Sequence, residues 1–154
     1  MSKQKTTIKG IENGRAKHAF DMADKVNKKL KDAYKSHVKK FPMYVKTNGL
    51  AAAITFLFSK GDKEKGVYKE VGNSIVEWLK EDDKYKFYDL EEVKSLQDLA
   101  ENIIKIDSSD YRALTIEVLS YFTWLRRFAE GLAEENTDKE VWLCNIFYLK
   151  IQKM

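Results

Sequence analysis

Apolar residues recur every three or four positions from residue 15 to residue 41, and this period predicts a long amphipathic helix. Lysines occupy most of the other positions of this stretch, so one side of the helix should be strongly basic. Residues 1–14 are basic, lack this period and contain two glycines, which indicates a flexible arm. The apolar stripe comprises Ala16, Ala19, Phe20, Ala23, Val26, Leu30, Ala33, Tyr34, Val38 and Phe41.

The next stretch, residues 41–59, is apolar and nearly uncharged. Pro42 suits a first helical position, because its missing N–H would be unpaired there in any case. We therefore expect one helix to end at Phe41 and a second to run from Pro42 to about Ser59. The pair Asn48-Gly49 is a turn signal when it is considered locally. The apolar period favours an uninterrupted helix instead, in which Gly49 and the following alanines form a flat packing face, and we prefer this second interpretation.

Three further helices follow from the same kind of pattern. Apolar positions from Val67 to Leu79 predict a third helix after a polar loop, residues 60–66. A fourth helix should begin at Asp89, since Asp89 and Glu92 have the spacing of a capping box. A fifth should begin at residues 108–110. Its apolar face is wide enough for a central position in the bundle, and the members of this face are Tyr111, Leu114, Val118, Tyr121, Phe122, Leu125, Phe128, Ala129 and Leu132.

The fifth predicted helix also carries charged residues that need partners. Glu117, Arg127 and Glu130 interrupt its apolar pattern. An arginine buried without an acidic partner would cost several kcal/mol. We therefore expect an internal ion pair for at least one of these residues.

The pattern of the C-terminal residues 137–154 distinguishes less clearly between a helix and a strand. Thr137 and Glu140 again show capping-box spacing, and the residues that follow are apolar on nearly every side. We prefer a sixth helix docked by Trp142, Ile146 and Leu149, while the β-branched and aromatic residues leave a strand open. Because a free segment of this kind would expose much apolar surface, it should pack on the bundle or on a partner.

Together these elements predict an all-α protein, a single-domain compact bundle of five to six helices over residues 15–154. The composition agrees, with 44% hydrophobic residues, 34% charged residues and one proline in 154 positions. No apolar run approaches the ~20 residues that span a bilayer, and no apolar segment follows the basic N-terminus. The single cysteine, Cys144, excludes an internal disulfide. We expect a cytoplasmic protein without membrane contact.

Charge is distributed unevenly along the chain. Residues 1–40 contain 12 Lys and Arg against 4 Asp and Glu, a balance of +8. Residues 41–154 contain 16 basic and 20 acidic residues, a balance of −4. The asymmetry suits a phosphate-binding face and a second face for a charged protein partner. Charge alone equally allows lysines that only keep the protein in solution.

Residue patterns that carry catalysis are missing from the sequence. It has no Gly-rich phosphate loop, no HExxH, no CxxC and no Ser-centred elbow. His18 and His37 lie about five turns apart on one predicted helix, too far to share a metal, and His37 borders the apolar stripe as a packed residue would. The acidic run 81–83 lacks a glycine-framed loop, which indicates a solvated cluster. We expect no catalytic activity, no metal and no cofactor.

Nucleic-acid binding has a positive signal at one corner of the predicted bundle. Lys35, Lys39 and Lys40 converge at the end of the first helix, next to Tyr44 and Lys46 at the start of the second. Such lysines could follow a sugar-phosphate backbone, and the tyrosine could support a base by stacking. These contacts would be independent of base sequence and sensitive to salt. The same corner could also be merely solvated.

An ordered set of residues across the chain resembles a known family. These residues are Arg15-Ala16, Tyr34-Lys35-Ser36, Phe41-Pro42, Asn48-Gly49-Leu50, Phe56-Leu57, Tyr111-Arg112, Thr115, Glu117, Leu125 and Arg127-Phe128-Ala129. Their order and spacing are similar to those of the small helical subunit of the type III-B CRISPR effector, the Cmr complex. The similarity covers roughly residues 15 to 131. Its most specific part is the proline, then Asn-Gly-Leu, then the alanine-rich helix.

The resemblance implies a compact helical subunit without nuclease activity. Copies of it would stack into a filament beside the large subunit, among the other Cmr subunits, and would face the guide RNA and the target RNA paired to it. Residues 132–154 exceed the family pattern and could be a docking element. Arg15 and Arg127 match the pattern but could be structural. The expected contacts with the RNA backbone are Lys35, Lys39, Lys40, Lys46 and Arg126.

The alternative function is a helical protein-interaction adaptor without direct nucleic-acid contact, in which the lysines only keep the protein in solution. It predicts that charge reversal of the basic corner leaves RNA affinity unchanged.

Overall fold

Helices account for nearly all of the chain that the computed structural model describes, residues 8–30 and 32–152. Side-chain environments are described for residues 10–30, 32–133, 145–146 and 148–152. Within these limits there are six α-helices, one 3-10 helix and no strand, which confirms the predicted all-α class. In chain order they are α1 Ile8–Leu30, α2 Asp32–Asn48, α3 Leu50–Lys60, α4 Lys63–Lys80, the 3-10 helix η1 Glu81–Tyr88, α5 Leu96–Ile103 and α6 Ser108–Gln152.

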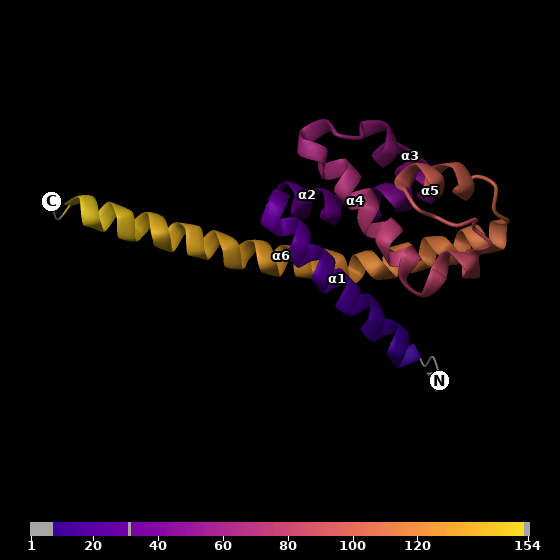
Figure 1. Ribbon diagram of the computed structural model, residues 1–154, viewed down its shortest axis with the longest axis horizontal. Helices are drawn as coiled ribbons and strands as arrows, with labels where there is room; N and C mark the ends of the chain where they lie inside the picture. The colour runs from indigo at the N-terminus through magenta and orange to yellow at the C-terminus, as the bar shows by residue number, and fades with distance from the viewer. Residues whose placement is uncertain (1–7, 31, 153–154) are drawn as a thin grey trace.

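The long helix α6 forms the axis on which the other helices are assembled (Figure 1). Helix α1 crosses the middle of α6 and makes the most extensive contact with it, and α2 and η1 also pack on α6. Helix α3 packs against α2, α4 and α5. The C-terminal end of α6 leaves the bundle and projects away from it (Figure 1).

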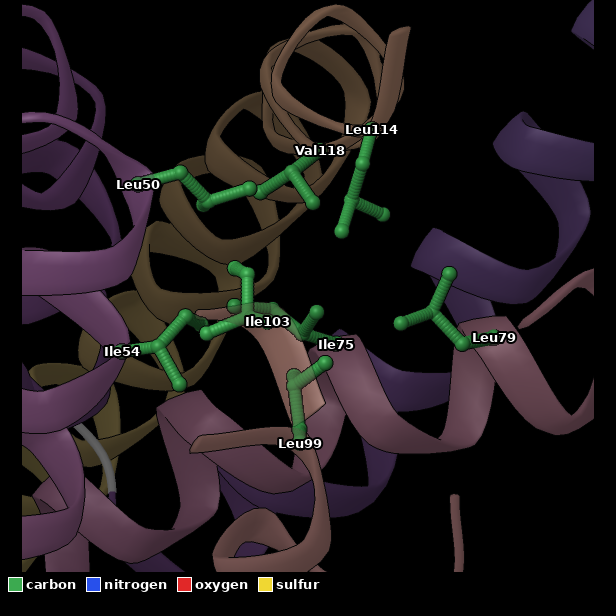
Figure 2. Close-up of a pocket in the computed structure, with 8 residues that line it drawn as sticks. All are labelled: Leu50, Ile54, Ile75, Leu79, Leu99, Ile103, Leu114 and Val118. Carbon is green, nitrogen blue, oxygen red and sulfur yellow. The ribbon is translucent and has the colours of Figure 1, made fainter. Parts of the chain in front are cut away.

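Aliphatic side chains from α3, α4, α5 and α6 fill the centre of the bundle (Figure 2). Each is at most 1% exposed, and no room for a water molecule remains between them. A core packed this closely, with only apolar walls, is a structural centre and no ligand cavity. Its members are Leu50, Ile54, Ile75, Leu79, Leu99, Ile103, Leu114 and Val118.

The predicted single helix over residues 15–41 is wrong, because α1, which ends at Leu30, and α2, which begins at Asp32, run in different directions (Figure 1). Lysines in the last turn of α1 and Asp32 in the first turn of α2 suit the dipoles of two separate helix ends. Helix α1 begins at Ile8, so residues 8–14 of the expected arm are helical. Residues 1–7 lie outside the described part of the chain.

Pro42 lies inside α2, so the predicted helix start at Pro42 is also wrong. Proline inside a helix removes one backbone hydrogen bond and crowds the preceding turn. Phe41 and Val45, on either side, are 4% and 2% exposed, and the Phe41 ring packs 4.7 Å from that of Phe122. Because these neighbours are buried in the core, α2 continues as a helix through the proline.

Gly49 is a turn between α2 and α3, so the preferred uninterrupted helix is wrong and the local turn signal was right. Its φ of 89° and ψ of 157° belong to a region that only glycine adopts readily. A Cβ at this position would lie 3.2 Å from the Tyr111 hydroxyl. That hydroxyl accepts a hydrogen bond from the Ala51 N–H at 2.9 Å, and so it satisfies one free donor at the start of α3.

The fourth predicted helix, α5, begins at Leu96 instead of Asp89. The capping box is formed by Ser95 and Asp98: the Asp98 N–H donates to Ser95 Oγ at 3.2 Å, and the Ser95 N–H donates to Asp98 Oδ2 at 3.2 Å. Leu90 and Val93 are buried as expected, but they lie in the segment that precedes the helix. The apolar pattern identified the buried positions correctly and the type of element incorrectly.

The predicted fifth and sixth helices are one continuous helix, α6. Its start at Ser108 is confirmed, and the Ser109 N–H donates to Asp107 Oδ2 at 3.1 Å. No new helix begins at Thr137, because alanine, leucine and glutamate favour continuation at residues 129–135. The expected docking of the C-terminus on the bundle is wrong for Leu149, which is 59% exposed. The side chain of Trp142 lies outside the described residues, and Ile146 is half-buried.

Candidate nucleic-acid interface

Helix α2 places three of the predicted RNA-contacting lysines on one side. Because the helix continues through Pro42, Lys39 follows Lys35 by about one turn and Lys46 follows Lys39 by about two turns. Each of these pairs of side chains therefore points in the same direction to within about 40°. The three side chains, here named the lysine face, extend over about 16 Å of the helix. This alignment replaces the expected corner between two helices.

The side chains of the lysine face reach solvent to different degrees. Lys35 is 30% exposed and Lys39 is 51% exposed, and Lys46 in the last turn of α2 is also exposed. Lys35 Nζ lies 3.6 Å from Asp32 Oδ1, an exposed carboxylate on the same helix. Exposed pairs of this kind are weak, so Lys35 can exchange Asp32 for another anion at little cost.

Glu130 of α6 lies beside the lysine face. Its Oε1 is 2.8 Å from Lys39 Nζ. This hydrogen bond, with the positive charges of Arg126 and Lys35 nearby, lowers the pKa of Glu130 below its usual value. Arg126 of α6 therefore belongs to the same cluster as Lys35 and Lys39. Sequence reasoning missed Glu130 as a partner of Lys39, because nothing in the pattern relates residues on two different helices.

Two residues of the predicted corner do not join the lysine face. Lys40 is exposed but lies about 100° around α2 from Lys39. Tyr44 is turned about 140° from Lys39, is half-buried, and packs 5.0 Å from the Phe56 ring. Tyr44 therefore does not lie beside the lysine face, and its ring packs against α3. Base stacking by Tyr44 stays a prediction.

Arg15 has a structural partner, as the expected internal ion pair requires. Its Nε donates to Glu117 Oε1 at 2.9 Å and its Nη2 donates to Glu117 Oε2 at 2.6 Å. The Trp78 indole N–H also donates to Glu117 Oε1 at 2.9 Å. Burial by itself raises the pKa of Glu117, but these donors and the charge of Arg15 outweigh it, so the pKa is lowered. Arg15 thus joins α1 to α6, whereas Arg127 is exposed.

Both histidines have structural neighbours. His18 Nδ1 lies 2.7 Å from the Tyr121 hydroxyl. His37 Nε2 lies 3.0 Å from Glu64 Oε2, and its ring packs 4.6 Å from Tyr68, which agrees with the packed position predicted for it. In the part of the chain that the structure describes, no group of three His, Cys, Asp or Glu residues could hold a metal ion.

A second group of lysines borders a cleft between α1 and α4. Lys25 and Lys29 of α1 and Lys94, which precedes α5, share its walls with Glu70 and Glu77 of α4. Lys29 Nζ lies 3.5 Å from Glu70 Oε1. The carboxylates make this cleft mixed in charge, so it is a useful comparison for the lysine face.

The fold and these clusters define a class: a small helical bundle with a cationic helix face and structural polar clusters. None of its described helices is long and apolar enough to cross a membrane.

Comparison with known proteins identifies the family. The model of the CRISPR-associated protein family Cas_Cmr5 matches residues 11–132, and the chain belongs to this family. A curated relative, the CRISPR system Cmr subunit Cmr5 of Thermus thermophilus, is 31% identical over 102 residues, which are 66% of this chain and 76% of the relative. The crystal structure of a Cmr5 family protein from Thermus thermophilus has a TM-score of 0.65 at 25% identity, and the match covers 84% of this chain and 98% of that one. The resemblance described from the sequence is confirmed.

Proposed function

We propose that this protein is a non-catalytic small subunit of a type III-B CRISPR (Cmr) effector complex and supports the guide and target RNA along its lysine face. The alignment of Lys35, Lys39 and Lys46 on one side of α2 supports this function most directly. Membership of the Cmr5 family supports the complex as its setting, with the large subunit, other Cmr subunits and neighbouring copies as partners.

The chemistry of the lysine face suits phosphates better than bases. Lysine carries a compact charge on a flexible stem, and contacts to phosphate carry no base-sequence information directly. Tyr44, whose ring packs on Phe56, lies about 140° around α2 from Lys39, so we expect the lysine face itself to contact phosphate. Binding is therefore electrostatic, independent of base sequence, and weakened by salt. Lys40, about 100° around α2 from Lys39, and Arg126 of α6, near Glu130, add positive charge around the lysine face.

Glu130 sets how much of this charge is available to RNA. Its carboxylate holds Lys39 at 2.8 Å and repels phosphate at the same time. RNA must displace this pair, which is partly exposed and therefore inexpensive to break. Glu130 thus limits the affinity of a single copy, and several copies side by side would supply the rest by multivalency.

Stacking of copies is supported by the uneven charge of the chain. Residues 1–40 have a balance of +8 and residues 41–154 a balance of −4, so a basic surface of one copy can lie beside an acidic surface of the next. Complementary charge of this kind orients partners and speeds their association more than it raises affinity.

The competing function is a protein-interaction adaptor that does not touch RNA. Large apolar side chains exposed at the end of α6 favour it, among them Tyr148, Leu149 and Ile151. The two functions differ in one measurable respect, because only RNA support requires the lysine face.

Affinity purification of the tagged chain from its native host tests the proposed function. We expect the guide RNA and the other Cmr subunits to co-elute with the wild-type chain. The variant Lys35→Gln/Lys39→Gln/Lys46→Gln should retain the protein partners and hold less target RNA. The control Lys25→Gln/Lys29→Gln/Lys94→Gln removes the same charge at the cleft and should behave as wild type. Wild-type chain that elutes without Cmr subunits contradicts the assignment to the complex, and a lysine-face variant that holds as much target RNA as wild type contradicts the RNA contact.

A further inference from the structure

The last part of α6 forms an isolated helix, residues 134–152, here named the C-terminal arm. Helix α6 has 45 residues and is about 68 Å long, and the arm accounts for roughly 28 Å of it. Figure 1 shows the arm extending beyond all other helices. The family match ends at residue 132, so the arm lies outside the region that the family model matches.

Large apolar side chains are exposed at the end of the arm. Tyr148 is 63% exposed, and Leu149 and Ile151 are each 59% exposed. Successive residues of a helix point about 100° apart, so these side chains cover more than one side of it. A helix that is apolar on most sides is normally buried. Because the arm continues α6 without a break and leads away from the bundle, a second molecule on the arm would bury these exposed side chains.

The order of charges along the arm indicates which molecule this is. Residues 134–140 contain four acidic residues and one lysine, and residues 141–149 contain no charge. Lys150 and Lys153 follow at the distal end. A second arm in antiparallel orientation would place the basic end of each copy beside the acidic segment of the other and the uncharged segments against one another. Parallel arms would place acidic beside acidic, and charges along paired helices set the partner and the orientation in this way.

We propose that the arms of two copies of this chain pair antiparallel about a two-fold axis near residue 144, the midpoint between the acidic and the basic segments. This interface is isologous: each copy offers the same surface. It joins copies through their arms, whereas the stacking described above joins their bundles. It needs neither RNA nor another Cmr subunit, so it can fail while RNA binding stands.

Light scattering during gel filtration of the purified chain, without RNA, measures the number of copies. The chain has a mass of 18.0 kDa, and we expect the measured mass to double as the concentration rises from low micromolar to millimolar. The variant Leu149→Glu/Ile151→Glu should remain a monomer. The control Ile104→Glu/Ile116→Glu changes residues that are 71% and 65% exposed on the bundle, and it should dimerise like wild type. A monomeric wild type, an unaffected arm variant or a monomeric control overturns the proposal.

Spin labels measure the orientation. With Cys144→Ser as background, a single label is attached at Asn145→Cys or at Gln152→Cys. Antiparallel arms with the axis near residue 144 place the two Gln152→Cys labels about 20 Å farther apart along the helices than the two Asn145→Cys labels. Equal separations at the two positions would show parallel arms and overturn the proposal.

Discussion

Replacing Glu117 with glutamine tests whether the ion pair between α1 and α6 stabilises the fold. Glutamine has nearly the same shape, and its amide oxygen can still accept the Trp78 indole N–H. It carries no charge, so Arg15 loses the carboxylate that receives two of its N–H groups at 2.9 and 2.6 Å. The side chain of Arg15 is only 16% exposed, and water cannot fully replace that carboxylate.

We expect the free energy of unfolding to fall by about 3 kcal/mol. Removing one partner of a buried ion pair typically costs about 3 to 5 kcal/mol. The lower end applies because Arg15 keeps a second carboxylate, Glu12 Oε2, at 2.7 Å, and that side chain is 49% exposed. For a chain of this size the loss corresponds to a decrease in melting temperature of roughly 6 to 12 °C.

Urea unfolding followed by circular dichroism measures this loss. Glu130→Gln is the matched control, because it removes another α6 carboxylate whose partner is exposed, and we expect it to cost less than about 1 kcal/mol. The double variant Arg15→Met/Glu117→Gln removes the uncompensated charge and should recover part of the loss. The reasoning is refuted if Glu117→Gln is no more destabilising than Glu130→Gln, or if the double variant is less stable than Glu117→Gln.

Three further predictions follow from the described contacts. Gly49→Ala should lose about 1 to 3 kcal/mol in urea unfolding, because Gly49 adopts a φ of 89° and ψ of 157°; Gly131→Ala, with open space around it in α6, should lose none. The pKa of Glu117 is lowered in the folded chain. The stability that the Glu117 carboxylate contributes is therefore complete above its pKa in the unfolded chain, about 4.3, and is lost as the pH falls through its pKa in the folded chain. The difference in unfolding free energy between wild type and Glu117→Gln should therefore shrink below that pH, and a constant difference contradicts the assignment. Glu130→Gln should bind single-stranded RNA more tightly in a gel-shift titration, because it releases Lys39, and an unchanged affinity would show that Glu130 does not limit binding.

The apolar period of the sequence was sufficient for the helical class and most of the core. Val67, Val71, Ile75 and Leu79 were placed on the buried side of one helix, and each is at most 1% exposed. Burial follows from period alone where a helix is long and regular. Leu90 was also placed correctly, although the segment around it is not helical.

Helix boundaries depended on contacts between residues far apart in the chain. The turn at Gly49 is completed by Tyr111, and the path through Pro42 is held by the packing of Phe41 on Phe122. Neither contact is visible in a local pattern, so the local turn signal and the period gave opposite answers at Gly49. The sequence indicated that a charged residue such as Glu117 needs an ion-pair partner, but it could not identify Arg15 as that partner.

The candidate site was predicted by residue type, and its geometry was not. The sequence selected Lys35, Lys39 and Lys46 as basic residues near a corner. Their alignment on one helix depends on Pro42 lying inside α2, which local proline chemistry disfavours. Their contact with RNA stays a prediction.

The salt dependence of RNA binding tests the central claim most directly. Affinity for single-stranded RNA is measured over a series of salt concentrations for wild type, the variant Lys35→Gln/Lys39→Gln/Lys46→Gln, and the control Lys25→Gln/Lys29→Gln/Lys94→Gln. Each lost phosphate contact on a single strand reduces the slope of log affinity against log salt by about 0.7, so the lysine-face variant should be less steep by about 2. The control should keep the wild-type slope. A lysine-face variant with the wild-type slope, or a control that loses as much, would contradict the account.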